Sequence, residues 1–246
     1  MQGKIALVTG GMGGIGTATA QQLAQKGAVV LVAYHRDRNA AVSWQEEQKK
    51  LGFDFTIVQG DITNFESASA MVAEALKKLG KIDILVNNAG IIQDTSLAKM
   101  SYEQWIKVID ADLNSLFNVT RNVLPKMLES QYGRIINISS VNAQKGQFGQ
   151  TNYTAAKAGV HGFTKSLAHE VAKKGITVNT VSPGYVKTAM MDNIAPEILD
   201  KIIQQIPVGR LALPLEIANM VCFLAAETSA YITGANFSIN GGLHMF

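Results

Sequence analysis

Tyr153 and Lys157 carry the two groups of this sequence that are best suited to moving a proton. They are four residues apart in a segment predicted to be helical over Asn152–Lys173, so both side chains lie on one face, one turn apart. A strand predicted over Arg134–Ile138 leads into Ser139–Ser140 shortly before this helix. A phenol beside an ammonium, with a serine hydroxyl at the end of a neighbouring strand, indicates general acid–base chemistry.

A glycine-rich turn near the start of the chain indicates a phosphate-binding site. The apolar strand Lys4–Thr9 runs into this turn, and a helix over Thr17–Lys26 follows it. Two glycine spacings fit: G-x-G-x-x-G at Gly11, Gly13 and Gly16, or T-G-x-x-x-G-x-G at Thr9, Gly10, Gly14 and Gly16. Either spacing lets a diphosphate approach the backbone N–H groups of the helix N-terminus. The alternative is a purely structural turn; a nucleotide-hydrolysing P-loop is disfavoured because Thr17 stands where that motif needs lysine.

The residues after the second predicted strand, Val29–Ala33, favour NADP(H) over NAD(H). An acidic residue that binds a ribose 2′-hydroxyl would stand near Tyr34, but no acid is found there. Arg36 and Arg38 follow instead, and a guanidinium attracts a 2′-phosphate. Asp37 is the alternative acid, and a solvated loop is the alternative role of either arginine.

Further polar residues follow the other predicted strands, where parallel sheets bind their ligands. The strand Phe53–Gln59 ends at Gly60-Asp61-Ile62, and Asp61 either caps the next helix or accepts a hydrogen bond from an adenine amino group. The strand Ile82–Val86 ends at Asn87–Gly90, and Ile176–Val181 ends at Ser182–Tyr185. Asn114 lies where two helical pieces within Ser101–Glu129 are interrupted; it is either a satisfied core amide or a functional residue.

Strands and helices alternate along all 246 residues. The pattern predicts one α/β domain, 1–246, with a doubly wound parallel sheet. The segment 185–213 has no clear periodicity, and we expect a partly helical flap over the site there. A helix over Pro214–Glu227 and a strand over Asn236–Ile239 complete the prediction, and the apolar tail 241–246 is expected to pack on a neighbour.

Composition limits the function classes. The net charge is +3, and no run of Lys or Arg exceeds a pair, so nucleic acid is not an expected partner. No apolar run is long enough for a membrane helix and the N-terminus leads directly into a strand, so we expect a cytoplasmic chain without a membrane partner. Cys222, the single cysteine, lies in an apolar run typical of a core. His35, His161, His169 and His244 have no ligand spacing with Cys or acids, so no metal site is expected.

Five motifs together resemble the short-chain dehydrogenase/reductase family, over the whole chain. They are the glycine turn Thr9-Gly10-x-x-x-Gly14-x-Gly16, the segment Asn87-Asn88-Ala89-Gly90, the isolated Asn114, the set Ser140, Tyr153 and Lys157, and Pro183-Gly184. The resemblance implies a Rossmann fold and the catalytic residues Asn114, Ser140, Tyr153 and Lys157. It favours the adenine contact for Asp61. The residues expected to bind NADP(H) are Gly10, Met12, Gly13, Gly14, Ile15, Gly16, Arg36, Gly60, Asp61, Ile62, Asn88, Ala89, Gly90, Tyr153, Lys157, Pro183, Gly184 and Val186.

Three segments, Gln144–Tyr153, Gly52–Phe55 and Asn240–Met245, resemble the bacterial acetoacetyl-CoA reductases of that family. This resemblance implies an acyl-CoA thioester substrate, a homotetramer, and reduction to (R)-3-hydroxybutyryl-CoA for polyhydroxybutyrate. The phosphate-binding arginine of these enzymes lies a few residues later, near Ala40 here, so Arg36 or Arg38 would have to replace it. The residues expected around the acyl group are Asp94, Ser140, Gln147, Phe148, Gln150 and Tyr185.

The implied mechanism delivers a hydride from NADPH to the 3-keto carbon and a proton from Tyr153 to its oxygen. A free phenol has a pKa of about 10, and Lys157 and a positive nicotinamide would lower it. Ser140 would hold the carbonyl oxygen, and Asn114 would hold a water that links Lys157 to solvent. The alternatives are a 3-oxoacyl-[acyl-carrier-protein] reductase, a steroid, sugar or polyol dehydrogenase, and a non-catalytic dinucleotide sensor.

Overall fold

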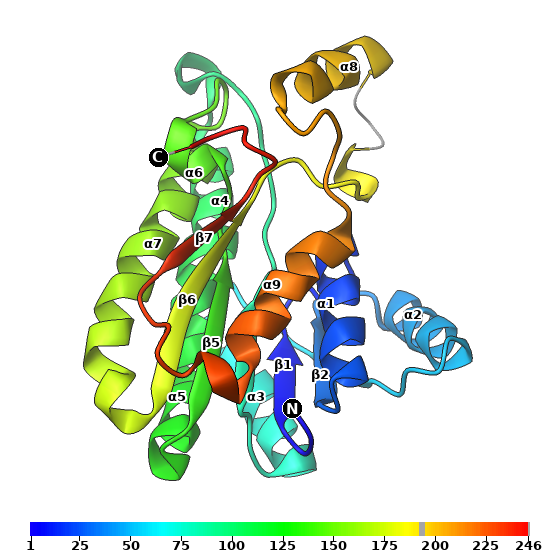
Figure 1. Cartoon of the computed structure of the whole chain (residues 1–246), viewed down its shortest axis with the longest axis vertical. Helices are drawn as coiled ribbons and strands as arrows, with labels where there is room; N and C mark the ends of the chain where they lie inside the picture. The colour runs from blue at the N-terminus through cyan, green and yellow to red at the C-terminus, as the bar shows by residue number, and fades with distance from the viewer. Residues whose placement is uncertain (192–194, 246) are drawn as a thin grey trace.

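A computed structural model describes residues 1–191 and 195–245 of the chain. All strands found in these residues form one parallel, seven-stranded sheet in the order β3-β2-β1-β4-β5-β6-β7 (Figure 1). The strands are β1 Ile5–Val8, β2 Val29–Tyr34, β3 Thr56–Gln59, β4 Ile84–Asn87, β5 Gly133–Ile138, β6 Ile176–Pro183 and β7 Asn236–Ile239. The predicted doubly wound α/β fold is therefore confirmed.

The side chains of the inner strands β2, β1, β4, β5 and β6 alternate between two apolar layers. In β1, Ile5 and Leu7 face the layer that holds α3, α5 and α7, whereas Ala6 and Val8 face the layer that holds α1 and α9. Burial on both faces explains why these strands read as continuous apolar runs in the sequence. Figure 1 shows α1 and α9 in front of the sheet and α7, α5 and α3 on its other side.

The main helices are α1 Gly14–Gln25, α2 Arg38–Lys50, α3 Phe65–Leu79, α4 Tyr102–Ile109, α5 Ser115–Ser130, α6 Asn142–Lys145, α7 Thr151–Val171, α8 Pro196–Gln205 and α9 Pro214–Ala225. Short 3-10 turns lie at Leu97–Lys99, Ala172–Lys174, Ala189–Met191 and Glu227–Ser229. Among the described residues, none of these helices is long and apolar enough to cross a bilayer.

The sheet reverses its direction of growth between β1 and β4, which are neighbours although they are far apart in the sequence. From β1 the chain continues outward through β2 and β3, and from β4 it continues the other way through β5, β6 and β7. A crevice opens at such a reversal beyond the carboxyl ends of the strands. The glycine turn follows β1 and the Asn87–Gly90 segment follows β4, so both lie at this crevice.

Two local features depart from the expected elements. The interruption predicted between the helical pieces of Ser101–Glu129 is a π-helical turn, Asp110–Asn114, which joins α4 to α5 without a break. Between β5 and α7, where no helix is predicted from the sequence, the chain forms the short helix α6. The segment 185–213 is partly helical, as expected, and contains α8; its residues 192–194, like Phe246 of the tail, lie outside the described residues.

Candidate active site

The glycine turn is held in place by the segment that follows β4. The Asn88 side-chain amide donates to the carbonyl oxygens of Thr9 and Gly10, at 3.1 and 3.0 Å. The Asn88 and Ala89 backbone N–H groups donate to Thr9 Oγ1, at 3.0 and 3.2 Å. These hydrogen bonds therefore join the carboxyl ends of β1 and β4 at the point where the strand order reverses.

The turn leaves room for a diphosphate. Gly13 is the N-cap of α1, and no side chain caps the helix within the described part of the chain, so its first N–H groups remain available. Gly10 has a φ of +59°, and a Cβ there would lie 2.8 Å from Ala89 Cα. A Cβ on Gly16 would lie 2.2 Å from the Gly10 carbonyl oxygen. These residues fit the pyrophosphate of a dinucleotide, because only glycine permits the turn to pack so closely.

One cavity of about 1030 Å³ joins the glycine turn to the acid–base residues. All residues expected to bind the cofactor line it, from Gly10 to Val186, and Thr188, Met191 and Ile202 line it from the segment 185–213. Its volume is at the upper end of the range for small-molecule sites, about 300–1,000 Å³. The cavity is therefore large enough for a cofactor and part of a second ligand.

The end of the cavity beside β2 carries opposite charges. Arg36, Asp37 and His35 line it, whereas Arg38, the first residue of α2, does not. Asp37 is the N-cap of α2, and its Oδ1 accepts from Ala40 N at 2.9 Å. Of the two arginines considered for a ribose phosphate, Arg36 is therefore the one that lines the cavity.

The neighbours of Asp61 exclude one of its two considered roles, the cap of the next helix. The N-cap of α3 is Asn64, whose Oδ1 accepts from Ser67 N at 2.9 Å. Asp61 lines the cavity, accepts from Thr63 through Oδ1, and lies 3.1 Å from His35 Nε2 through Oδ2. Burial raises the pKa of Asp61, but the Thr63 and His35 contacts outweigh it and leave the pKa lowered.

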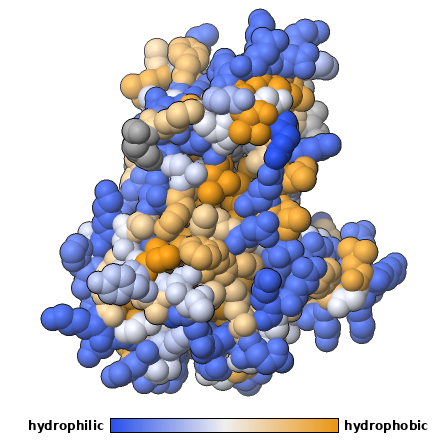
Figure 2. Space-filling view, viewed as in Figure 1, coloured by the Kyte–Doolittle hydropathy of each residue, from blue (hydrophilic) through white to orange (hydrophobic). Residues whose placement is uncertain are grey.

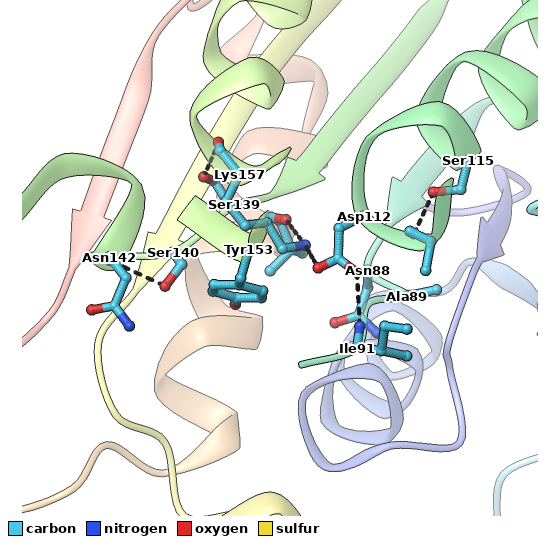
Figure 3. A network of polar contacts seen from close by, with 12 residues as sticks. Asn88, Ala89, Ile91, Asp112, Ser115, Ser139, Ser140, Asn142, Tyr153 and Lys157 are labelled. Carbon is cyan, nitrogen blue, oxygen red and sulfur yellow. Dashed lines mark hydrogen bonds and ion pairs between the residues drawn. The ribbon is translucent and has the colours of Figure 1, made fainter. Parts of the chain in front are cut away.

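Ser140, Tyr153 and Lys157 come together where β5 ends against α7 (Figure 3). Ser139 Oγ donates to the Lys157 carbonyl oxygen at 2.7 Å, which fixes the strand end to the helix. Lys157 Nζ donates to the Ile138 carbonyl oxygen at 3.1 Å and lies 5.8 Å from the centre of the Tyr153 ring. The arrangement brings a phenol, an ammonium and a serine hydroxyl to one wall of the cavity.

Asn114 is not part of this arrangement, which corrects the expectation for that residue. Asn114 is exposed, does not line the cavity, and donates to Asp110 Oδ1 at 2.7 Å. The π-helical turn presents Asp112 to the cavity instead. A π turn contains an extra residue, which shifts the inward-facing position relative to regular helical spacing.

Asp112 is fully buried and forms an ion pair with Lys157 (Figure 3). Its Oδ2 lies 3.3 Å from Lys157 Nζ, and its Oδ1 accepts from Ile91 N at 2.8 Å. Burial raises the pKa of the Asp112 carboxyl against the opposing effects of Lys157 and Ile91. Burial is the largest single effect on the pKa of Lys157 and lowers it, but the charge and hydrogen bond of Asp112 together with the charge of Tyr153 outweigh burial and leave that pKa raised, so the lysine stays protonated.

The protein environment does not lower the pKa of Tyr153, contrary to expectation. Burial raises this pKa most; Lys157 opposes the rise and Asp112 adds to it, while hydrogen bonding with Ser140 lowers it and Asp94 raises it further. The sequence argument counted Lys157 but omitted the burial of the Tyr153 ring, which is the larger effect, and the carboxylate partner of Lys157.

Most residues expected around an acyl group line the cavity, but Phe148 does not. Asp94, Gln147, Gln150 and Tyr185 face it together with Ser140. Gln150 links two of its walls, because it donates to Asp94 Oδ2 at 2.9 Å and accepts from Asn142 Nδ2 at 2.8 Å. Phe148 is 89% exposed and lies outside the cavity lining, so the structure gives no support to its role as a rim residue.

The sequence argument missed several residues of the cavity. Asp112 could have been found as a second polar position in the interrupted helix, and His35 as the residue directly after β2. Asn142 and Thr188 carried no signal, because they lie in segments without regular periodicity. Among the described residues, no group of three His, Cys, Asp or Glu could hold a metal ion.

Comparisons with known proteins find similar proteins over nearly the whole chain. Residues 10–244 match a family model described as enoyl-(acyl carrier protein) reductase. The chain is 52% identical over 245 residues to an acetoacetyl-CoA reductase of Cupriavidus necator, with all of both chains covered. It is 53% identical to nodulation protein G of Azospirillum brasilense, with 99% of each chain covered, and 43% identical to the 3-oxoacyl-[acyl-carrier-protein] reductase of Staphylococcus aureus strain Mu50, with 98% of each covered. With its parallel sheet, its glycine turn and its Ser140, Tyr153 and Lys157 set, the chain belongs to the short-chain dehydrogenase/reductase family of oxidoreductases.

Proposed function

We propose that this protein reduces acetoacetyl-CoA to (R)-3-hydroxybutyryl-CoA with NADPH, in the synthesis of polyhydroxybutyrate. The observation that carries the proposal is the single cavity that joins the glycine turn to Ser140, Tyr153 and Lys157. Full-length identity of 52% to an acetoacetyl-CoA reductase supports the choice of substrate within the family. The stereochemistry and the pathway follow from that similarity alone.

The chain's own residues supply binding and the proton. The first turn of α1 holds the diphosphate, and the cofactor supplies the hydride when it is bound. Ser140 holds the keto oxygen beside Tyr153, and Tyr153 donates the proton to that oxygen. Lys157 keeps a positive charge near the phenol, which favours its loss of the proton. Asp94, Gln147, Gln150 and Tyr185 surround the acyl group.

NADP(H) is the proposed cofactor because Arg36 lines the end of the cavity beside β2. A guanidinium there pairs with a 2′-phosphate, which NADH lacks. Asp37 is the N-cap of α2 and Asp61 lies beside His35, so both carboxylates already have local partners. The segment 185–213 is proposed to act as a flap, with α8 contributing Ile202 to the cavity wall.

A homotetramer in the cytoplasm is the proposed state. β7 is the edge strand of the sheet and its residues are only half-buried, while Phe223 and Leu215 of α9 are exposed. Figure 2 shows apolar residues gathered along the middle of this face, over β7 and α9. An apolar face beside an unpaired strand edge favours packing against another copy of the chain.

A 3-oxoacyl-[acyl-carrier-protein] reductase is the second candidate, supported by the 43% identity to such an enzyme. The chemistry is the same, and only the carrier of the acyl group differs. The test follows the loss of NADPH absorbance with acetoacetyl-CoA, beside parallel reactions with NADH and with acetoacetyl-carrier protein. We expect turnover with NADPH and the CoA ester to exceed turnover with either replacement.

Tyr153→Phe is the matched control, because it keeps the ring and removes the hydroxyl. We expect it to bind NADPH and to lose nearly all turnover. Higher turnover with the carrier protein would move this chain to fatty-acid synthesis. Turnover with neither ester would overturn the proposed substrate.

A further inference from the structure

A buried carboxylate that nothing in the proposed mechanism uses lies beside the acid–base residues. Asp112 is 0% exposed. Within the described part of the chain, its Oδ2 has no partner other than the Lys157 ammonium 3.3 Å away. A buried carboxylate without a counter-charge is strongly disfavoured, so Lys157 is what allows Asp112 to be charged at this position.

Three segments of the chain contribute to this ion pair and its surroundings. The π-helical turn brings Asp112 inward, α7 supplies Lys157, and the segment after β4 supplies Gly90 and the Ile91 N–H. A Cβ on Gly90 would lie 2.8 Å from Asp112 Oδ2 and 3.1 Å from Lys157 Nζ. The absent side chain of Gly90 therefore leaves the space that the pair occupies.

The charged groups around Tyr153 are few. Lys157 faces it from its own helix, Asp112 from the π-helical turn and Asp94 from the segment after β4. Tyr185, after β6, and Lys107, in α4, are further titratable groups of the same cavity. Among the charged groups that shift the pKa of Tyr153, Lys157 is the positive one, and its nearest carboxylate is Asp112. The field of the ammonium at the phenol is therefore weaker than that of an unpaired lysine.

We propose that Asp112 is a positioning residue that holds Lys157 in a buried ion pair and offsets part of its charge, so that Tyr153 remains able to donate a proton up to a higher pH. The proposal deepens the proposed function and rests on it only for Tyr153 as the proton donor. The negative charge of Asp112 raises the pKa of Tyr153 in addition to the larger effect of burial, which agrees with this direction.

Asp112→Asn tests the proposal, since it keeps the size and the oxygen that accepts from Ile91 N but removes the charge. Tyr153 must be protonated for reduction, so the basic limb of kcat/KM reports its loss of the proton. We expect this limb to move to lower pH by about one unit in Asp112→Asn. In the oxidation of (R)-3-hydroxybutyryl-CoA the phenolate is the base, so the acidic limb should also move to lower pH.

Asp110→Asn is the matched control. It removes the same charge from the same turn, but Asp110 lies outside the cavity and pairs with Asn114. We expect its limbs to coincide with those of the wild type. A shift as large as that of Asp112→Asn would show that the charge of the turn acts generally, and would overturn the specific role of Asp112.

A second readout does not depend on turnover. The ultraviolet absorbance of tyrosinate is titrated in the protein and in Tyr153→Phe, and the difference gives the ionisation of Tyr153. The ionisation of Tyr153 should move to lower pH when Asp112→Asn is introduced into both the wild type and Tyr153→Phe. If Asp112→Asn does not fold, Asp112→Ser offers a smaller neutral replacement. An unmoved titration overturns the inference; a moved titration without turnover on either thioester leaves the inference standing and overturns the proposed function.

Discussion

At the scale of single residues, the site depends on which charged side chains reach the cavity. Arg36 and Arg38 were equivalent in the sequence, because both follow β2 within four residues of Tyr34. The structure separates them, since Arg36 lines the cavity and Arg38 begins α2 outside it. The distinction comes from the place where α2 begins, which is set by the cap that Asp37 provides.

Arg36→Ala should weaken NADPH selectively. Loss of a charge-assisted contact to a 2′-phosphate costs about 1.5–3 kcal/mol, so we expect KM for NADPH to rise about ten-fold or more while KM for NADH changes little. Steady-state kinetics with both cofactors checks this. Arg38→Ala removes the same charge two residues away and should leave both constants near their wild-type values. If both substitutions raised KM for NADPH equally, the 2′-phosphate would be bound by the charge of the whole loop and not by Arg36 specifically.

At the scale of elements, most of the fold could be predicted from the sequence because a buried parallel strand leaves an apolar run that ends in polar or glycine residues. The site was less predictable where the helical period fails. Asn114 and Asp112 are two residues apart, and only the π-helical turn decides which of them faces Lys157. Apolar spacing does not reveal one extra residue in a helix. The prediction that Phe148 lies at the rim of the cavity failed for a related reason. The position of a residue in a loop does not specify the direction of its side chain.

The cap of α3 is another feature that the sequence left open between two residues. Asn64 provides this cap, and Asp61 does not. Asn64→Ala removes the acceptor for Ser67 N and should lower the free energy of unfolding by about 1 kcal/mol. Urea unfolding followed by circular dichroism measures the change. Asn64→Asp keeps an acceptor at the helix N-terminus and should remain close to the wild type. Both variants lack the side-chain amide N–H group of Asn64. If Asn64→Asp lowered the free energy of unfolding as much as Asn64→Ala, the amide would have a role other than capping.

At the scale of the whole molecule, the point where the strand order reverses determines the position of the candidate active site. The uncovered edge of the sheet lies away from this point. The reversal between β1 and β4 gathers the strand ends that carry the glycine turn, the Asn88 segment and, one strand further, Ser140. β7 ends the sheet on the other side, next to β6, with half-buried residues along its length. The molecule therefore has one face suited to small ligands and an edge suited to another copy of itself.

This arrangement predicts that α9 and β7 lie in the interface of the proposed homotetramer. Phe223 of α9 is 51% exposed, and a charge there would have to be buried in the interface without a partner. We expect sedimentation velocity to give the mass of four chains for the wild type and smaller species for Phe223→Arg. Leu51→Arg is the matched control, because Leu51 is exposed directly after α2, a helix that lies at the opposite edge of the molecule from β7 in Figure 1. If Phe223→Arg kept the full mass, the interface would have to lie on other elements, since an unpaired arginine could not remain at the centre of a packed apolar contact.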